Sequence, residues 1–292
     1  MREQGPESVC AIVVTHDRRE LLRDCLTRLA GQQRPLDATL VVDNASGDGT
    51  AEMVQTDFPG ARLLRMEENV GGAGGFHHGV AWAYERGFDW LWLMDDDTLA
   101  LPDTLRTLLD GARRAPAGRP LLVASQVRWK DERLHPMNRS VPRWRDRALM
   151  AEAAAHGLVA LRYATFVSVA LSREAVERFG LPRAEYFIWG DDVEYTARVL
   201  RDDPGYLVPE SRVYHWTPEP HAAATPTSDR FYFHARNTLL TLRGTSFAGL
   251  ERFDQARYLA RTAVEYIRVN FRDRRRMQLL ARAFRDGLRA PR

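Results

Sequence analysis

Lysine and cysteine are both scarce in this sequence of 292 residues. Lys130 is the single lysine among 42 basic residues, so arginine carries almost all of the positive charge. Because 39 acidic residues leave a formal net charge of only +3, the composition disfavours a nucleic-acid-binding protein, and we expect no nucleic-acid partner. The two cysteines, Cys10 and Cys25, lack the spacing of metal ligands, so we expect two reduced thiols in a cytoplasmic protein.

Long hydrophobic runs are absent as well. Residues 1–14 contain no basic segment followed by a long apolar stretch, so no secretory signal is expected. A transmembrane helix needs about 18 uninterrupted apolar residues, and the nearest candidate, residues 158–171, contains Arg162. With 45% hydrophobic and 28% charged residues, the chain instead fits one large α/β domain, or a domain of about 200–250 residues with an appendage.

The first hundred residues alternate between two kinds of segment. Strand-like apolar runs cover residues 9–14, 38–46, 61–66 and 90–94, and helix-like segments cover residues 18–32, 50–58 and 75–87. This alternation predicts an α/β fold with a mostly parallel sheet and right-handed crossovers. Ligands of such sheets bind beyond the carboxyl ends of the strands. Four polar or glycine-rich loops are expected to gather there, at residues 15–18, 43–50, 69–76 and 95–98.

The second half of the chain is less regular. Residues 115–165 predict loops with one short helix, and apolar character returns at residues 164–172. A helix closed by Gly180 follows, and a later strand-like run ends in "VYHW". We expect an α/β domain over residues 1–227 and a helical C-terminal extension over residues 228–292.

The end of this extension is strongly basic. Eight arginines follow residue 271, against two aspartates, and the apolar spacing of "MQLLARAF" is helical. This pattern favours a helix that lies on an anionic membrane surface. A solvated basic helix is the alternative.

The glycine-rich run "NVGGAGGF" (residues 69–76) matches neither the Rossmann fingerprint nor a P-loop. One interpretation is a flexible loop. The other is a backbone that approaches a ligand closely before a helix N-terminus, where amide groups and the helix dipole favour a diphosphate.

Three consecutive carboxylates, Asp95, Asp96 and Asp97, end the strand-like run "WLWLM". In an extended segment the first and third side chains point to the same side, so Asp95 and Asp97 can share a hard cation such as Mn²⁺ or Mg²⁺. An acidic surface turn or a helix N-cap is the alternative.

A second acidic cluster occurs in "WGDDVEY", which contains Asp191, Asp192 and Glu194. One interpretation is a general base that takes a proton from an attacking hydroxyl. The other is ordinary compensation of a helix dipole by acidic residues in the first turn. His215 in "VYHW" is either a metal ligand or a buried structural histidine.

The order of these motifs resembles glycosyltransferase family 2, whose members have the GT-A fold. "NVGGAGGFHHG", "GFDWLWLMDDDT", "FIWGDDVEY" and "RFYFHARN" are similar to segments of the galactofuranosyltransferases of cell-wall galactan synthesis, especially the enzyme that starts the galactan on a lipid-linked acceptor. Related rhamnosyltransferases share part of the pattern. The resemblance covers roughly residues 9–240 and implies inverting transfer from a nucleotide sugar.

The resemblance also implies roles for individual residues. The nucleotide-sugar donor is expected at Thr15, Asp17, Arg18, Asp43, Asn69, Gly71, Gly72 and Asp96. Asp95 and Asp97 would hold Mn²⁺ or Mg²⁺ at the diphosphate, with His215 as a further ligand. Asp192 would be the base, while Asp191 and Trp189 would face the acceptor. Some relatives have Glu as the second acid of the pair, which leaves the base open between Asp191 and Asp192.

The expected acceptor is a lipid-linked glycan, and the expected location is the cytoplasm or, peripherally, the inner face of the plasma membrane. A rhamnosyltransferase that uses dTDP-rhamnose is the nearest alternative. A non-catalytic sugar-nucleotide or glycan-binding module would not need two acidic clusters. A nucleotidyltransferase would need a lysine-containing glycine-rich loop, which this sequence lacks.

Overall fold

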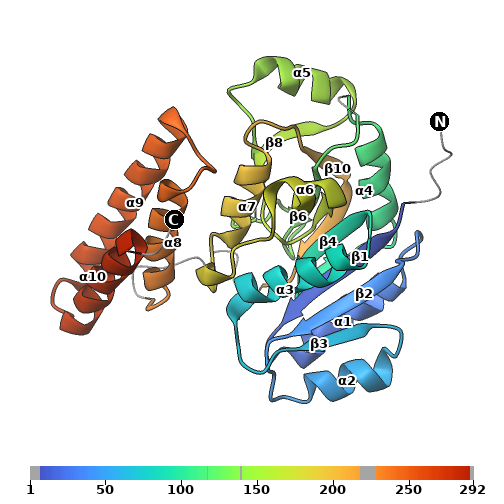
Figure 1. Cartoon of the computed structure of the whole chain (residues 1–292), viewed down its shortest axis with the longest axis horizontal. Helices are drawn as coiled ribbons and strands as arrows, with labels where there is room; N and C mark the ends of the chain where they lie inside the picture. The colour runs from blue at the N-terminus through green and yellow to red at the C-terminus, as the bar shows by residue number, and fades with distance from the viewer. Residues whose placement is uncertain (1–6, 117, 139, 218–227, 290–292) are drawn as a thin grey trace.

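A ten-stranded sheet organises the computed structural model, which describes residues 7–116, 118–138, 140–217 and 228–289 (Figure 1). The strands are β1 (Val9–Thr15), β2 (Ala38–Asp43), β3 (Arg62–Arg65), β4 (Trp90–Asp95), β5 (Thr98–Ala100), β6 (Leu122–Arg128), β7 (Val141–Pro142), β8 (Val159–Tyr163), β9 (Val169–Ser172) and β10 (Tyr206–His215). The helices are α1 (Arg19–Ala30), α2 (Thr50–Asp57), α3 (Gly71–Glu85), α4 (Thr104–Arg113), α5 (Arg147–Ala155), α6 (Arg173–Phe179), the 3₁₀ turn η1 (Ala184–Tyr186), α7 (Asp191–Val199), α8 (Phe231–Arg243), α9 (Gly249–Asn270) and α10 (Arg274–Arg289).

The strand order is β3-β2-β1-β4-β9-β6-β10-β8-β7, and β5 pairs with β10. The first four strands along the chain are parallel to one another, as the alternation of strands and helices predicts. The register pairs Thr15 with Asp43 and Val14 with Asp95. The carboxyl ends of β1, β2 and β4 therefore meet at one edge of the sheet. β9 runs antiparallel to both β4 and β6, so pairing beyond β4 is mixed.

Alternate residues of β1 supply the cores on the two faces of the sheet. Val13 belongs to the cluster that includes residues of α1, α2 and α4, whereas Ile12 belongs to the cluster that includes residues of α3, α6 and α7. Cys10 and Cys25 are both free and buried, one in each cluster. The α/β class predicted from the sequence is confirmed.

Helix α3 begins earlier than the sequence predicts. The glycine run was expected to be a loop, but α3 starts at Gly71 and contains most of it. A Cβ atom on Gly75 would lie 2.4 Å from Val14 Cγ1, and one on Gly79 would lie 2.5 Å from Ile12 Cγ2. These glycines let α3 pack directly on β1, so the lack of side chains serves close packing and not only flexibility.

The prediction for residues 115–165 was also incomplete. The expected short helix is α5, but the segment contains strands β6, β7 and β8 as well. β6 lies between β9 and β10 in the sheet. Its buried Ser125 interrupts the apolar pattern and is satisfied by hydrogen bonds with Ser168 and Ser211, each 2.8 Å long. Because these partners are distant in sequence, the residues near Ser125 do not by themselves predict a buried strand.

The helices α8, α9 and α10 share a hydrophobic cluster of their own and lie together at one side of the sheet domain (Figure 1). The helical extension is therefore confirmed as helical, but the division at residue 227 stays a prediction because residues 218–227 lie outside the described residues, as do residues 290–292. Leu280 and Ala283 of α10 are buried against this cluster. The apolar side of α10 is thus occupied, which argues against the expected membrane-lying tail helix.

In the described part of the chain, no helix is long and apolar enough to cross a membrane.

Candidate active site

Hydrogen bonds join the four predicted loops at one edge of the sheet. Thr15 Oγ1 donates to Asp96 Oδ2 at 2.7 Å, and Asp17 Oδ1 accepts from the backbone of Gly47 at 2.7 Å. Asn44 Nδ2 donates to the carbonyl of Gly71 at 3.1 Å. The loops at residues 15–18, 43–50, 69–76 and 95–98 therefore form one structure, as the parallel strand order predicts.

Arg18 lies between two of the strand-end carboxylates. Its Nη1 is 3.2 Å from Asp96 Oδ1 and 2.9 Å from Asp97 Oδ2. An open cavity of about 350 Å³ is lined by Asp17 and Arg18 among others. Since half of the Arg18 side chain surface is exposed (48%), the guanidinium can also reach an anion in solution.

Asp43 ends β2 and is fully buried. Its Oδ1 accepts from the backbone of Ser46 at 2.9 Å, while its Oδ2 has no hydrogen-bond partner among the described residues and lies 3.6 Å from Arg65 Nε. Asp17 and Ala45 in these loops have positive φ angles of 51° and 58°. Non-glycine residues adopt such angles at a cost, and they occur often at functional sites.

The metal ligands expected from the resemblance lie together. Ligand atoms of Asp95, Asp97 and His215 are all within 4.8 Å of one another. His215 Nε2 is 2.8 Å from Asp97 Oδ1 and 4.0 Å from Asp95 Oδ2. On the other side of the ring, Nδ1 lies 2.8 Å from Asn138 Oδ1. A hydrogen bond of this kind fixes the orientation of a ligating histidine, and sequence reasoning missed Asn138 because it lies in an irregular segment.

The strand-end cluster carries more negative charge than its surroundings neutralise. Burial, followed by the charge of Asp97, raises the pKa of Asp95 to about 7. The same two causes raise the pKa of Asp96 to about 6. Burial would raise the pKa of Asp97 too, but the hydrogen bond and charge of His215, with the charge of Arg18, lower it. Two carboxylates and one imidazole nitrogen fit Mn²⁺, and the carboxylates also suit Mg²⁺.

The second acidic cluster begins α7. Asp191 is nearly buried (6% exposed), and Asp192 is half-buried, with Oδ1 accepting from the backbone of Val193 at 2.7 Å. Burial raises the pKa of both carboxyls, that of Asp191 to well above its usual value and that of Asp192 to about 6. The charge of Asp192 also contributes to the raised pKa of Asp95. The two acidic clusters are therefore close enough to share one site.

Glu194 has a different role from the aspartates before it. It is buried, and its Oε1 accepts from Arg198 Nε at 3.0 Å and from Ser246 Oγ at 2.8 Å. A carboxylate held in an ion pair with two donors is structural. The acidic pair alone remains available for chemistry.

The loop before α7 is held by an asparagine that sequence reasoning did not assign. Asn237 Nδ2 on α8 lies 2.9, 2.8 and 2.7 Å from the carbonyl oxygens of Tyr186, Ile188 and Trp189. Phe187 and Trp189 in this loop have positive φ angles of 63° and 66°. Asn237 ends the motif "RFYFHARN", so the C-terminal extension holds the strained loop that carries Trp189 and leads into the acidic pair.

The glycines that begin α3 contact the same loop. A Cβ atom on Gly71 would lie 2.0 Å from the carbonyl oxygen of Phe187, and Gly71 has a φ of +73°. Its backbone N–H donates to Asn69 Oδ1 at 2.8 Å. A Cβ atom on Gly72 would meet nothing within 4 Å. Gly71 is therefore required by the loop, and Gly72 is the glycine with open space beside it.

Comparisons with known sequences agree on one family. The family described as "Glycosyl transferase family 2" matches residues 10–179. Galactofuranosyltransferase GlfT1 of Mycolicibacterium smegmatis is 34% identical over 202 residues, which cover 67% of this chain and 66% of that protein. GlfT1 of Mycobacterium tuberculosis is 35% identical over 217 residues, which cover 70% of each chain. The match thus spans about two thirds of the length of these relatives.

Solved structures share the fold at low sequence identity. S. aureus TarS 1-349 in complex with UDP-GlcNAc has a TM-score of 0.62 at 14% identity, with 96% of this chain and 80% of that chain covered. The mannosyltransferase PcManGT from Pyrobaculum calidifontis, in complex with GDP-Man and Mn²⁺, has a TM-score of 0.58 at 19% identity, with 99% and 84% covered. From its matching family model, its relatives and its GT-A architecture, this chain belongs to glycosyltransferase family 2.

Proposed function

We propose that this protein is an inverting, metal-dependent glycosyltransferase that moves a sugar from a nucleotide-sugar donor to a hydroxyl of a lipid-linked glycan. The observation that carries the proposal is the presence of two acidic clusters in one site, one beside His215 and Arg18 and one without a paired cation among the described residues. Glycosyl transfer needs one group at the departing diphosphate and another at the attacking hydroxyl.

The donor side is formed by the ends of β1, β2 and β4. Asp95, Asp97 and His215 would hold the cation, which as a Lewis acid stabilises the charge that develops on the departing diphosphate. The remaining donor residues predicted from the resemblance are Thr15, Asp17, Arg18, Asp43, Asn69, Gly71, Gly72 and Asp96. The buried Asp43 Oδ2, which has no hydrogen-bond partner in the described part of the chain, offers an acceptor for an N–H group of the nucleoside.

The acceptor side is formed by the start of α7. Asp192 is the more exposed acid of the pair, and its pKa of about 6 leaves it ionised at neutral pH. It takes the proton of the acceptor hydroxyl while that oxygen attacks the anomeric carbon and the bond to the diphosphate breaks. Asp191, whose pKa is raised by burial and then by the charge of Asp192, faces the acceptor together with Trp189.

The donor sugar we favour is galactofuranose, from UDP-galactofuranose, because both relatives at 34–35% identity are galactofuranosyltransferases. Such a transfer belongs to cell-wall or surface polysaccharide synthesis and takes place at the cytoplasmic side of a membrane. The alternatives are transfer of rhamnose from dTDP-rhamnose and a non-catalytic sugar-nucleotide-binding module.

One assay separates these alternatives. The protein is incubated with UDP-galactofuranose, dTDP-rhamnose or GDP-mannose, with Mn²⁺ or Mg²⁺, and with or without crude lipid-linked acceptors. We expect release of the nucleoside diphosphate that requires the acceptor and is fastest with UDP-galactofuranose. Acceptor-dependent release of the nucleoside diphosphate with dTDP-rhamnose, and with neither of the other donors, would identify a rhamnosyltransferase. Binding of a donor without any acceptor-dependent release would show a non-catalytic module.

A further inference from the structure

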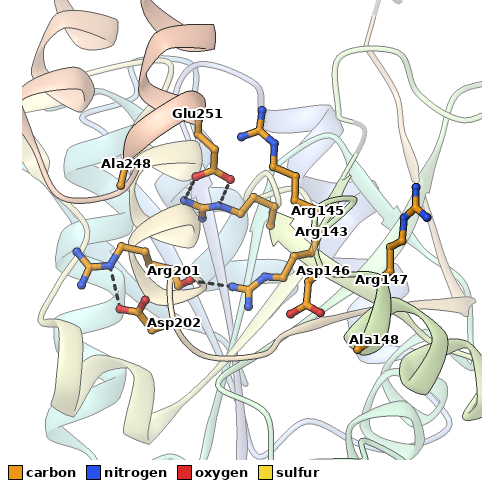
Figure 2. Close-up of a pocket in the computed structure, with 10 residues that line it drawn as sticks. Arg143, Arg145, Asp146, Arg147, Ala148, Arg201, Asp202, Ala248 and Glu251 are labelled. Atoms are coloured by element: carbon orange, nitrogen blue, oxygen red, sulfur yellow. Dashed lines mark hydrogen bonds and ion pairs between the residues drawn. The ribbon is translucent and has the colours of Figure 1, made fainter.

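A second cavity, of about 830 Å³, lies between the sheet domain and the start of α9 (Figure 2). Five arginines, three acidic residues and two alanines line it. Figure 2 shows Arg143, Arg145 and Arg147 on the side formed by the segment that leads into α5, opposite Ala248 and Glu251. None of these residues belongs to the site described above.

Three of the five arginines are matched by carboxylates. Arg162 Nε is 2.8 Å from Glu251 Oε1, and Arg145 Nη2 is 3.0 Å from Asp254 Oδ2. Arg201 Nε is 2.9 Å from Asp202 Oδ2. The charges of these three arginines are therefore already balanced.

The other two arginines have no such partner. Within the described chain, neither Arg143 nor Arg147 forms an ion pair, and Asp146 between them caps α5 by accepting from the backbone of Leu149 at 3.0 Å. Arg143 Nη2 donates instead to backbone carbonyls, among them Arg201 O at 3.2 Å. Burial, followed by the charge of Arg162, lowers the pKa of Arg143, and the charges of Asp146, Glu251 and Asp202 offset this only in part. An anion beside Arg143 and Arg147 would relieve this excess of positive charge.

The N-terminus of α9 adds to the positive potential. Ala248 lines the cavity and is the N-cap of this 22-residue helix, and it has no side-chain oxygen to accept from the first N–H groups. Unpaired N–H groups and the helix dipole favour an anion at this position. Arginine pairs are well suited to phosphate oxygens.

Large exposed apolar side chains are close in sequence to the residues that line the cavity. Trp144 is 70% exposed and stands between Arg143 and Arg145 in sequence; Leu250, next to Glu251, is also 70% exposed, and Phe253 is 63% exposed. Exposed apolar groups of this size are typical of interaction sites.

The apolar surface continues along α9. Residues 250, 253, 264, 267 and 271, the last directly after the helix, fall on one side of it at spacings of three, eleven, three and four, and all five are exposed apolar side chains: Leu250, Phe253, Val264, Ile267 and Phe271. Arg257, Arg261 and Arg268 lie on or beside the same stripe. An apolar stripe flanked by arginines is typical of a helix at the surface of an anionic membrane.

We propose that the arginine cavity binds the phosphate or diphosphate head group of a membrane lipid while Trp144, Leu250 and Phe253 enter the apolar layer. This inference deepens the proposed function. Its link to the acceptor rests on that function. Helix α7 begins at the acidic pair and ends next to Arg201, which lines the cavity, and it rises about 12 Å from Asp192 to Leu200. A lipid phosphate held there would leave its glycan free to reach Asp192.

The test measures binding of the full chain to vesicles. Phosphatidylcholine vesicles are compared with vesicles that also contain a polyprenyl phosphate, in a flotation assay. We expect tight binding only with the lipid phosphate. Arg143→Gln/Arg147→Gln should weaken this binding about 30-fold, since each arginine contributes about fivefold. The matched control is Arg28→Gln/Arg62→Gln, which removes two exposed, unpaired arginines elsewhere in the described chain and should change binding less than threefold.

Further variants keep the test decisive. Arg147 is exposed, so Arg147→Glu will fold even if Arg143→Gln does not, and it should weaken vesicle binding at least tenfold. Phe253→Ser should weaken binding to vesicles but not to inorganic pyrophosphate. If pyrophosphate binds as tightly as the vesicles do, and Phe253→Ser changes neither, the site takes free phosphate and the lipid proposal is wrong. Equal vesicle binding by wild type and Arg147→Glu also overturns it.

Transfer by the unmodified protein is measured in parallel, so the two proposals fail separately. Arginine-dependent vesicle binding without acceptor-dependent transfer would support the cavity and refute the proposed function. Acceptor-dependent transfer, together with vesicle binding that does not change when Arg143 and Arg147 are replaced, would support the proposed function and refute the cavity.

Discussion

The two acidic clusters of this protein both bring like charges together, but their surroundings differ in the cationic groups that they supply. Asp96 and Asp97, at the end of β4, are met by Arg18, and Asp97 is met by His215 as well. Asp191 and Asp192, at the start of α7, have no ion-pair partner in the described part of the chain, and burial raises the pKa of both.

The difference indicates a division of labour. A cluster that gathers two carboxylates and an imidazole is arranged for a cation, which neutralises like charges that otherwise repel each other. A buried acidic pair without a cation relieves its repulsion by retaining a proton. The first cluster therefore suits the departing diphosphate, and the second suits proton transfer. The predictions below test this comparison, beginning with the largest expected effect.

Replacing a ligand in the cation cluster should abolish transfer. We expect Asp97→Ala to reduce acceptor-dependent release below detection and to weaken Mn²⁺-dependent binding of the nucleoside diphosphate, because several kcal/mol of charge stabilisation is lost. His215→Ala should have a smaller effect. Calorimetry with and without a chelator measures the binding, and Asp24→Ala, an exposed aspartate of α1, is the control. Full transfer by Asp97→Ala in the presence of a chelator would remove the cation from the mechanism.

Replacing the base should spare the donor side. Asp192→Asn keeps the shape of the side chain but cannot accept the proton, so transfer should fall by about 10²–10⁴-fold. Affinities for donor and Mn²⁺ should stay within about twofold of wild type. Asp191→Asn should mainly raise the KM for the acceptor. Donor titration and single-turnover transfer separate these effects, and near-normal transfer by Asp192→Asn with none by Asp191→Asn would move the base to Asp191.

The pH dependence of transfer should report the second cluster. Asp192 must be ionised to accept a proton, and its pKa is raised to about 6, so kcat/KM should fall tenfold for each pH unit below about 6 and level off above about 7. Saturating Mn²⁺ keeps the strand-end carboxylates ionised, so the slope then belongs to the acidic pair. A profile that stays flat down to pH 5 would contradict this assignment.

Loosening the loop before α7 should act through acceptor placement. Asn237→Ala removes the amide that holds the carbonyls of Tyr186, Ile188 and Trp189. A small displacement of a positioned group can cost about 10²-fold, so we expect transfer to fall by about 10- to 100-fold with donor affinity unchanged. Thr238→Ala on the same helix is the control. An unchanged acceptor KM for Asn237→Ala would show that the loop holds its shape alone.

The smallest expected effect concerns stability. A carboxyl whose pKa is raised in the folded protein stabilises the fold most below its unfolded pKa of about 3.9, and that contribution is lost as the pH rises toward the folded pKa. The pKa of Asp191 is raised well above its usual value. Asp191→Asn should therefore raise Tm by about 2–4 °C at pH 8, about 1 kcal/mol, and by less at pH 5. Thermal unfolding at both pH values checks this, and a lower Tm at pH 8 would argue against it.

The sequence alone determined which residue types would meet at the edge of the sheet. Strand periodicity and helix spacing are local properties, and parallel strands place their carboxyl ends together whatever the rest of the chain does. The positions of Thr15, Asp43 and Asp95 at that edge could therefore be predicted. The three C-terminal helices could be predicted for the same reason, since helical spacing needs no distant partner.

The tertiary structure alone decided how these groups are held. Asn138 orients His215 and Asn237 holds the loop at Trp189, contacts that join residues 77 and 48 positions apart. It also decided that α9, and not α10, exposes an apolar stripe, because the apolar side of α10 packs in the cluster that it shares with α8. A periodic pattern shows that a helix has an apolar side, but which surface covers that side depends on packing between segments distant in the sequence, and no local pattern encodes it.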